Sequence, residues 1–192
     1  MLKSLISKTR SYRRFYQDTP VDMDTLRELV DLARHSASDA NLQPLKYVLC
    51  VDKKTNPLIF ETLGWAAYLK DWPGPVEGER PAAYIVILQD TQISNKPFLD
   101  HGIAAQYILL GATEKNLSGC MIATINRNRL RKSLAIEDRY DILLVVAIGK
   151  PKEVVTIEYI DSTGDIKYWR DDEQVHHVPK RRLEDLVLKE YA

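Results

Sequence analysis

The chain has 192 residues, of which 45% are hydrophobic and 28% charged, and its 27 basic and 27 acidic residues leave no net charge. This length and composition suit one globular domain, and the absence of a basic excess argues against general nucleic-acid binding. We expect no membrane span, because no apolar run reaches about 18 residues, and the polar N-terminus does not resemble a secretory signal, so a soluble cytoplasmic protein is the default expectation.

Helical and strand patterns alternate along the first part of the chain. Leu2, Leu5 and Ile6 have helical spacing. Asp22 can cap a stronger helix whose apolar face runs to Ala33. Further along, the patterns predict a loop at 36–44, a strand at 46–51, a helix at 57–69, a loop rich in Pro and Gly at 71–81, a buried strand at 82–88 and a long central helix at 97–115.

The last third of the chain changes in character. A strand at 119–125, a basic helix at 126–134 and a buried strand at 142–148 complete the regular pattern. Residues 154–159 and 166–169 are expected to pair around a turn at 162–165, and an amphipathic stretch at 183–188 ends the chain. We interpret residues 1–192 as a single α+β domain with a C-terminal extension, about 152–192, that reaches onto a partner.

Several familiar sites are missing from the sequence. It has no GxGxxG turn, no P-loop and no GxSxG elbow. Cys50 and Cys120 stand alone, without metal or redox spacing, and are expected to be buried thiols. His176 and His177 would point to opposite faces of a strand. We therefore predict neither a metal site nor a disulfide.

Two clusters of basic residues could bind an anion. Arg10, Arg13 and Arg14 cluster with Ser11 near the N-terminus, and Lys180 and Arg182 form a second cluster near the C-terminus. Guanidinium groups bind phosphate through paired donors, and a hydroxyl adds another. Each cluster taken alone fits a solvated basic turn better than a binding site.

A polar loop separates the second predicted helix from the first predicted strand. Its side chains Ser38, Asn41 and Gln43 include two amides, which both donate and accept hydrogen bonds. They suit a planar heterocycle with mixed polar edges. Ordinary turn chemistry is the alternative, and it is favoured when the loop is considered by itself.

The order of these features resembles the FMN-dependent nitroreductase family. The family opening, similar to Arg-Ser-x-Arg-x-Phe before a Pro-Val and a helix, corresponds to 10–15 and Pro20-Val21. The family motif Ala-Pro-Ser-x-x-Asn-x-Gln-Pro-Trp resembles the segment up to Leu45, with Ala37 in place of the proline and Leu45 in place of the aromatic residue. The helix from Asp100, the segment 116–122 and Gly149-Lys150-Pro151 also resemble the family pattern.

The resemblance implies a nitroreductase-like fold with a central mixed, mostly antiparallel sheet flanked by helices. It also implies an obligate homodimer with FMN at the interface and a tail from Val154 onward that embraces the partner. On that basis Arg10, Ser11 and Arg13 hold the phosphate and ribityl chain, and Lys180 and Arg182 add phosphate contacts. Ile122 and Ala123 approach the flavin ring, while Ala37, Ser38 and Asn41 come from the other subunit. Gln43 also belongs to the cofactor-binding set. Arg14, at the variable position, is expected at the surface.

The family chemistry would be ping-pong hydride transfer from NADH or NADPH through FMN to nitroaromatic, quinone or related acceptors. Such transfer needs no acid–base side chain, so no catalytic residue is assigned. Tyr68 and Trp72, with Trp65, could form an aromatic wall for the substrate; a core plug is an equally weighted alternative. The other functions left open are an FMN store or sensor, a different flavin reaction, and a polyanion-binding protein.

Overall fold

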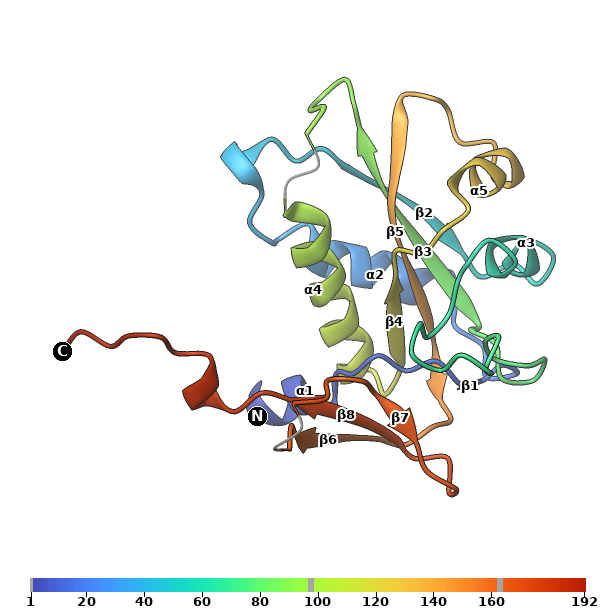
Figure 1. Ribbon diagram of the computed structural model, residues 1–192. Helices are drawn as coiled ribbons and strands as arrows, with labels where there is room; N and C mark the ends of the chain where they lie inside the picture. The colour runs from blue at the N-terminus through green and yellow to red at the C-terminus, as the bar shows by residue number, and fades with distance from the viewer. Residues whose placement is uncertain (1, 97–98, 162–163) are drawn as a thin grey trace.

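The computed structural model describes residues 2–96, 99–161 and 164–192, and these form a large and a small sheet with helices on both faces of the large one (Figure 1). The elements in chain order are α1 (Leu2–Lys8), β1 (Phe15–Tyr16), α2 (Met23–Ala33), the 3-10 turn η1 (Asp39–Asn41), β2 (Leu45–Cys50), α3 (Asn56–Phe60), β3 (Ala83–Asp90), α4 (Asp100–Glu114), β4 (Ser118–Ile122), α5 (Arg127–Ser133), β5 (Tyr140–Pro151), β6 (Val155–Tyr159), β7 (Trp169–Arg170), β8 (His176–Lys180) and the 3-10 turn η2 (Leu183–Asp185).

The large sheet has the strand order β1-β5-β3-β2, and β4 also pairs with β5. All of these ladders are antiparallel. Every residue of β3 is buried, because the strand lies between β2 and β5 and has helices over both faces. Its continuous apolar, β-branched run is typical of a strand covered on two sides, and the α+β fold predicted from the sequence is confirmed.

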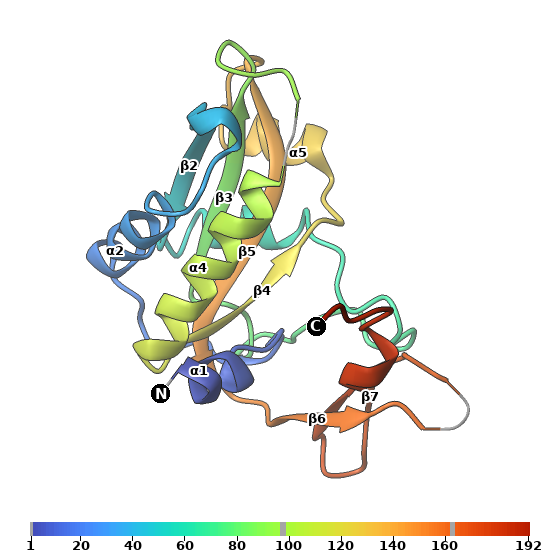
Figure 2. The same cartoon turned by 90° about the vertical axis from the view of Figure 1, so that its left-hand side faces the viewer.

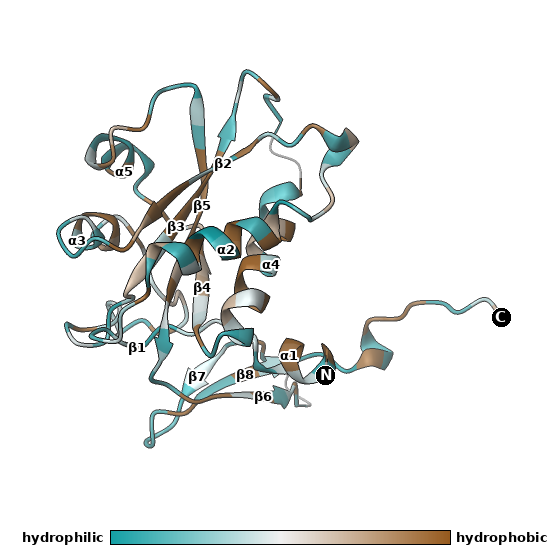
Figure 3. Ribbon diagram, turned by 180° about the vertical axis from the view of Figure 1, so that it is seen from behind, coloured by the Kyte–Doolittle hydropathy of each residue, from teal (hydrophilic) through white to brown (hydrophobic). Residues whose placement is uncertain are grey.

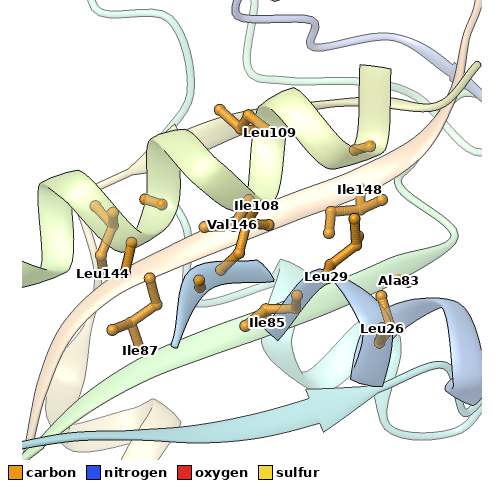
Figure 4. Packing of buried hydrophobic residues seen from close by; sticks show 14 of the residues in the cluster. Leu26, Leu29, Ala83, Ile85, Ile87, Ile108, Leu109, Leu144, Val146 and Ile148 are labelled. Carbon is orange, nitrogen blue, oxygen red and sulfur yellow. The ribbon is translucent and has the colours of Figure 1, made fainter. Parts of the chain in front are cut away.

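Helices α2 and α4 cover one face of the large sheet (Figure 2). Figure 4 shows Leu26 and Leu29 of α2 and Ile108 of α4 against Ile85 and Val146 of the sheet. Asp22 caps α2 by accepting a hydrogen bond from the Thr25 backbone, as its position before the helix predicted. Seen from behind, the outward face of α2 is hydrophilic while the sheet strands are largely hydrophobic (Figure 3).

The opposite face packs against the short helices α3 and α5. Ile59 and Leu130 are fully buried there against Tyr84, Val86 and other strand residues. The predicted helix at 57–69 is wrong beyond Phe60. The Leu63 backbone pairs with Ile125, and the Gly64 N–H donates to the Thr124 carbonyl oxygen at 2.8 Å, which draws this segment out into an extended connection.

The small sheet has the order β6-β8-β7 and lies below the large one in Figure 1. The hairpin predicted between 154–159 and 166–169 is wrong, because β6 pairs with β8 in parallel and β7 pairs with β8 in an antiparallel ladder. Residues 162–163 of the predicted turn lie outside the described residues. The predicted amphipathic stretch at 183–188 forms only η2, and Leu183 and Leu188 are 72% and 93% exposed.

The remaining boundaries shift only slightly. The long helix predicted at 97–115 is α4, whose predicted first residues, 97–98, are not among those described. The strand predicted at 119–125 ends at Ile122, and the one predicted at 142–148 extends to both sides as β5. Within the described ranges, no helix has the length and apolarity needed to cross a membrane.

Candidate functional site

Two adjoining cavities of about 320 and 350 Å3 lie between β4, the segment after α1 and the small sheet. Arg13, Met121 and Tyr168 line both of them, so the two cavities share a wall and together make up the candidate site. Gly64–Ala67 and Cys120–Thr124 line the first cavity; Arg10, Ser11, Gln106, His176 and Lys180 are among the residues that line the second.

The N-terminal segment is fixed along the edge of β4. The Tyr12 N–H donates to the Gly119 carbonyl oxygen at 3.0 Å, and Ser11 forms an isolated parallel bridge with Gly119. The Thr9 hydroxyl donates to the Leu5 carbonyl oxygen at 2.9 Å and lies 3.0 Å from the Thr113 hydroxyl of α4. These contacts place the basic cluster at the mouth of the second cavity.

Glu153 connects this segment to the small sheet. Its carboxylate is fully buried and accepts hydrogen bonds from the backbone N–H groups of Arg13 and Arg14. The second carboxylate oxygen accepts from Arg170 at 2.9 Å. A buried charge is costly unless it is paired and hydrogen-bonded. Here Arg170 pairs the charge, while the two backbone N–H groups tie the segment that presents Arg13 to the small sheet region.

The Arg13 guanidinium is held against two ring side chains of the small sheet region. It lies 4.8 Å from the centre of the Tyr168 ring, and its Nη1 is 3.2 Å from His176 Nε2. Burial, reinforced by Arg13, lowers the pKa of His176 to about 4. A neutral imidazole can accept from an arginine, which only donates, so His176 orients Arg13 without adding a competing charge.

Three cations converge on the second cavity. Arg10, Arg13 and Lys180 line it, and none of its lining residues in the described part of the chain is acidic. Arg10 Nη2 donates to the Ile6 carbonyl oxygen at 2.7 Å, while its buried Nε has no partner among the described residues. An uncompensated cluster of guanidinium and ammonium groups is suited to a phosphate or another anion.

The structure therefore brings together most of the residues predicted for phosphate binding. Arg10, Ser11, Arg13 and Lys180 share the second cavity, although they come from opposite ends of the sequence. Arg182 does not line it, because its guanidinium lies 4.8 Å from the Tyr159 ring.

Arg14 does not lie free at the surface as expected. Arg14 forms a two-point ion pair with Glu79, at 2.6 and 2.7 Å. The ammonium of Lys152 also contacts Glu79, at 2.9 Å. The hydrogen bond from Arg14 is the main reason that the pKa of Glu79 is lowered to about 2. Arg14 thus attaches the 71–81 loop to the main sheet.

Ile122 and Ala123, which the resemblance assigns to the flavin ring, line the first cavity. Beside them, Cys120 is a buried free thiol, and burial raises its pKa. Cys50 is also a free, buried thiol, as predicted. No group of His, Cys, Asp and Glu residues able to hold a metal ion occurs within the described ranges.

The polar loop after α2 lies in a different part of the chain surface. Ala37, Ser38 and Gln43 line a separate cavity of about 190 Å3, and Asn41 is exposed nearby. The Ser38 hydroxyl donates to buried Asp100 at 2.5 Å and accepts from the Gln43 N–H at 2.9 Å. Within one chain, these residues do not join the cationic site.

The aromatic loop contributes differently from the prediction. Tyr68 contacts Tyr168 at a ring separation of 5.0 Å, and Trp72 lies under Arg170 at 4.3 Å, but neither side chain lines the two cavities. Trp65 does line the first cavity. Gly74, at φ +123°, lets the chain pass closely behind it, since a Cβ there would lie 2.7 Å from Trp65 Cδ1.

Sequence reasoning missed several lining or supporting residues. His176, Val178 and Lys180 all line the second cavity from alternate positions of β8. That period of two was visible in the sequence and links His176 to the predicted Lys180. For Tyr168 and Glu153 no local pattern gives a comparable signal.

Comparisons with known proteins give a consistent answer. The sequence model described as the nitroreductase family matches residues 6–150. MhqN of Bacillus subtilis (strain 168), named as an NAD(P)H nitroreductase with the assignment marked as provisional, is 23% identical over 189 residues, covering 77% of this chain and 87% of MhqN.

Solved structures support the same fold. An FMN-dependent nitroreductase from Clostridium difficile R20291 aligns with a TM-score of 0.65 at 23% identity, covering 90% of this chain and 99% of that one. A nitroreductase family protein from Clostridium novyi NT aligns with a TM-score of 0.64 at 23% identity, covering 93% of this chain and 94% of that one. Because the family model spans well over half of the sequence, the chain belongs to the nitroreductase family.

Proposed function

We propose that this protein is an FMN-dependent oxidoreductase that uses NADH or NADPH to reduce nitroaromatic, quinone or related acceptors. The observation that carries the proposal is the convergence of Arg10, Arg13 and Lys180 on one cavity. None of the described residues that line this cavity is acidic. The adjoining cavity extends the site along β4. The similarity in fold to an FMN-dependent nitroreductase supports the same assignment.

The unpaired polar atoms of the two cavities fit this cofactor. Arg10 Nε, His176 Nδ1 and Trp65 Nε1 are buried and have no partner among the described residues. With His176 neutral and accepting from Arg13 at Nε2, all three atoms are donors. FMN carries phosphate and ring acceptors, and buried donors are stabilised by such partners.

Each part of the site then has a defined role. Arg10, Ser11, Arg13 and Lys180 would hold the phosphate and ribityl chain, and Ile122 and Ala123 would border the flavin ring. Glu153 holds the Arg13 backbone, and His176 and Tyr168 fix its guanidinium. Preorganised charges of this kind cost no rearrangement when the ligand binds.

When bound, FMN supplies hydride transfer from the nicotinamide to the acceptor. The protein's part is positioning and electrostatics. Cations at the cavity favour negative charge there, and the indole of Trp65 offers an apolar wall that excludes water. Cys120 stays a protonated thiol because burial raises its pKa, so it takes no nucleophilic part.

The proposed site is completed by a second copy of the chain. Ala37, Ser38, Asn41 and Gln43 do not reach the cationic cavities of their own chain, and a homodimer would bring the partner's loop to them. The C-terminal tail supports this arrangement. It extends away from the body (Figure 1), with Leu186, Leu188 and Tyr191 at least 61% exposed.

Anaerobic mixing of the FMN-loaded protein with NADH and with NADPH tests the enzymatic part. We expect loss of the flavin's visible band with at least one nucleotide and its return when a quinone or nitroaromatic acceptor is added. A protein that holds FMN but is never bleached would instead be a flavin store or sensor.

A further inference from the structure

A separate cavity of about 430 Å3 lies beside α3, away from the proposed flavin site. It is lined by residues of the segment 17–21, of the turn after β2, of helix α3 and of the segment 77–84. None of its lining residues belongs to the two cavities around Arg13. Its volume is within the range of small-molecule sites, about 300–1,000 Å3.

Arg80 is fixed in this cavity but has no charged partner. Its guanidinium lies 4.4 Å from the centre of the Phe60 ring, and its backbone N–H donates to Gln17 Oε1 at 3.1 Å. The carboxylate next to it in sequence, Glu79, is already paired with Arg14 and Lys152. In the described part of the chain, no hydrogen bond or ion pair is formed by the Arg80 guanidinium, so its charge is available to an anion.

Three polar groups of the cavity lack a hydrogen-bond partner. They are Arg80 Nε, the Tyr84 hydroxyl and Asn56 Oδ1, and all three are buried and have no partner among the described residues. Tyr84 is 0% exposed, and burial raises its pKa, so its hydroxyl remains a donor. The Asn56 amide nitrogen donates to the Ala82 carbonyl oxygen at 2.7 Å, which leaves its oxygen as a free acceptor.

This pattern of donors and acceptors indicates which polar groups a ligand of the cavity would carry. Arg80 and Tyr84 supply two donors for one acidic group, and Asn56 supplies an acceptor for a hydroxyl. Val21, Val51 and several prolines give the cavity apolar walls. The exposed carboxylates Asp18 and Glu77 and the exposed ammonium of Lys53 also line the cavity. With Arg80 the lining carries two charges of each sign, so it has no cationic excess for a multiply charged anion such as a phosphate ester.

We propose that this cavity is a second binding site, for a small aromatic hydroxycarboxylate. The ligand carboxylate accepts from Arg80 and Tyr84, its hydroxyl donates to Asn56, and its ring lies against the apolar walls. The site is independent of the proposed flavin chemistry. Buried polar groups gain most from a partner that satisfies them all, which is why this class is preferred over a plain apolar molecule.

Calorimetric titration with 4-hydroxybenzoate tests the proposal. The wild-type protein, with and without saturating FMN, should bind the probe saturably, one molecule per chain. Tyr84→Phe removes only the hydroxyl and Arg80→Gln removes the charge, so each should weaken binding by about tenfold or more. The uncharged analogue 4-hydroxybenzamide should bind more weakly than the acid.

Arg13→Ala is the matched control, because it removes a guanidinium from the flavin cavity instead. It should bind 4-hydroxybenzoate as the wild type does. The proposal is overturned if the wild type shows no saturable binding up to about 10 mM probe, or if Tyr84→Phe and Arg80→Gln bind unchanged. It is equally overturned if binding is lost in Arg13→Ala alone. If Tyr84→Phe does not fold, Arg80→Gln serves as the test of the site, because Arg80 is only half-buried and its replacement disturbs the fold less.

Discussion

The large and small sheets of this protein are stabilised in different ways. In the large sheet, β3 is buried along its whole length and its neighbours pack apolar side chains against four helices. In the strands of the small sheet only His176 of β8 is buried, and every residue of β6 and β7 is at least partly exposed. The hydrophobic effect therefore accounts for the stability of the large sheet but contributes little to that of the small sheet.

Polar contacts hold the small sheet instead. Glu153 pairs with Arg170, His177 contacts both Glu158 and Asp171, and the Trp169 ring stacks on His177 at 4.1 Å. This sheet and the loop before it supply Tyr168, His176 and Lys180 to the proposed site. The proposed site is therefore assembled by charge pairs on a scaffold that apolar packing stabilises.

Glu153→Ala should give the largest effect. It leaves Arg170 with an uncompensated buried charge and removes the acceptor from two backbone N–H groups. We expect a loss of about 3–5 kcal/mol in the stability of the contact between the small sheet and the N-terminal segment. Urea denaturation combined with hydrogen exchange of residues 164–192 measures it.

Glu158→Ala is the control for that variant. Glu158 lies on the same small sheet, but its side chain is 38% exposed, so its pair with His177 should be worth at most about 1 kcal/mol. If the two variants lowered stability equally, Glu153 would not be the main link between the small sheet and the N-terminal segment.

Ile85→Ala should destabilise the other sheet. The side chain is fully buried between β2 and β5, and its loss leaves a cavity costing about 2–5 kcal/mol in the free energy of unfolding. Hydrogen exchange should accelerate across the whole large sheet. A change confined to residues 164–192 would contradict the division between the two regions.

Arg13→Ala should act on the ligand rather than on the fold. Loss of a charge-assisted contact should weaken FMN binding by about 1.5–3 kcal/mol, measured by fluorescence titration of the purified protein. Arg129→Ala on α5, far from the cationic cavity, provides the control and should bind FMN normally. Unchanged affinity in Arg13→Ala would refute its assigned role.

The smallest effect concerns pH. The folded-state pKa of His176, about 4, lies below its usual value of 6.5. Its contribution to stability is therefore complete above pH 6.5 and is lost as the pH falls through 4. His176→Gln should reduce the difference in unfolding free energy between about pH 7 and about pH 5. If both proteins lose stability equally over that interval, His176 is not buried in its neutral form.

Four strands of the large sheet, β2 to β5, could be predicted from sequence because each carries its own signal, whereas the two-residue strand β1 gave none. The apolar runs of β3 and β5 identify buried strands without any knowledge of their partners. The small sheet could not be predicted. In it β8 lies between β6 and β7, so β6 pairs with a strand that comes after β7 in the chain instead of with β7 itself. Local turn residues carry no sign of that order and predicted a hairpin that does not form.

The residues of the candidate site also fall into a group that could be predicted from sequence and a group that could not. Arg10, Ser11, Arg13 and Lys180 were predictable as anion-binding residue types in a family-like order. The place of Arg182 on the Tyr159 ring, and the pairing of Arg14 with Glu79, follow from tertiary contacts that no local pattern encodes. Trp65 rather than Tyr68 lines the cavity because the helix predicted at 57–69 ends at Phe60.

The central claim is that the cavity lined by Arg10, Arg13 and Lys180 holds FMN. The most direct test is the visible absorption spectrum of the purified protein after incubation with FMN and removal of free flavin, with the double variant Arg13→Ala, Lys180→Ala beside it. We expect flavin bands in the wild type and their loss in the variant. A wild type that stays colourless, or a variant that retains the bands in full, would contradict the claim.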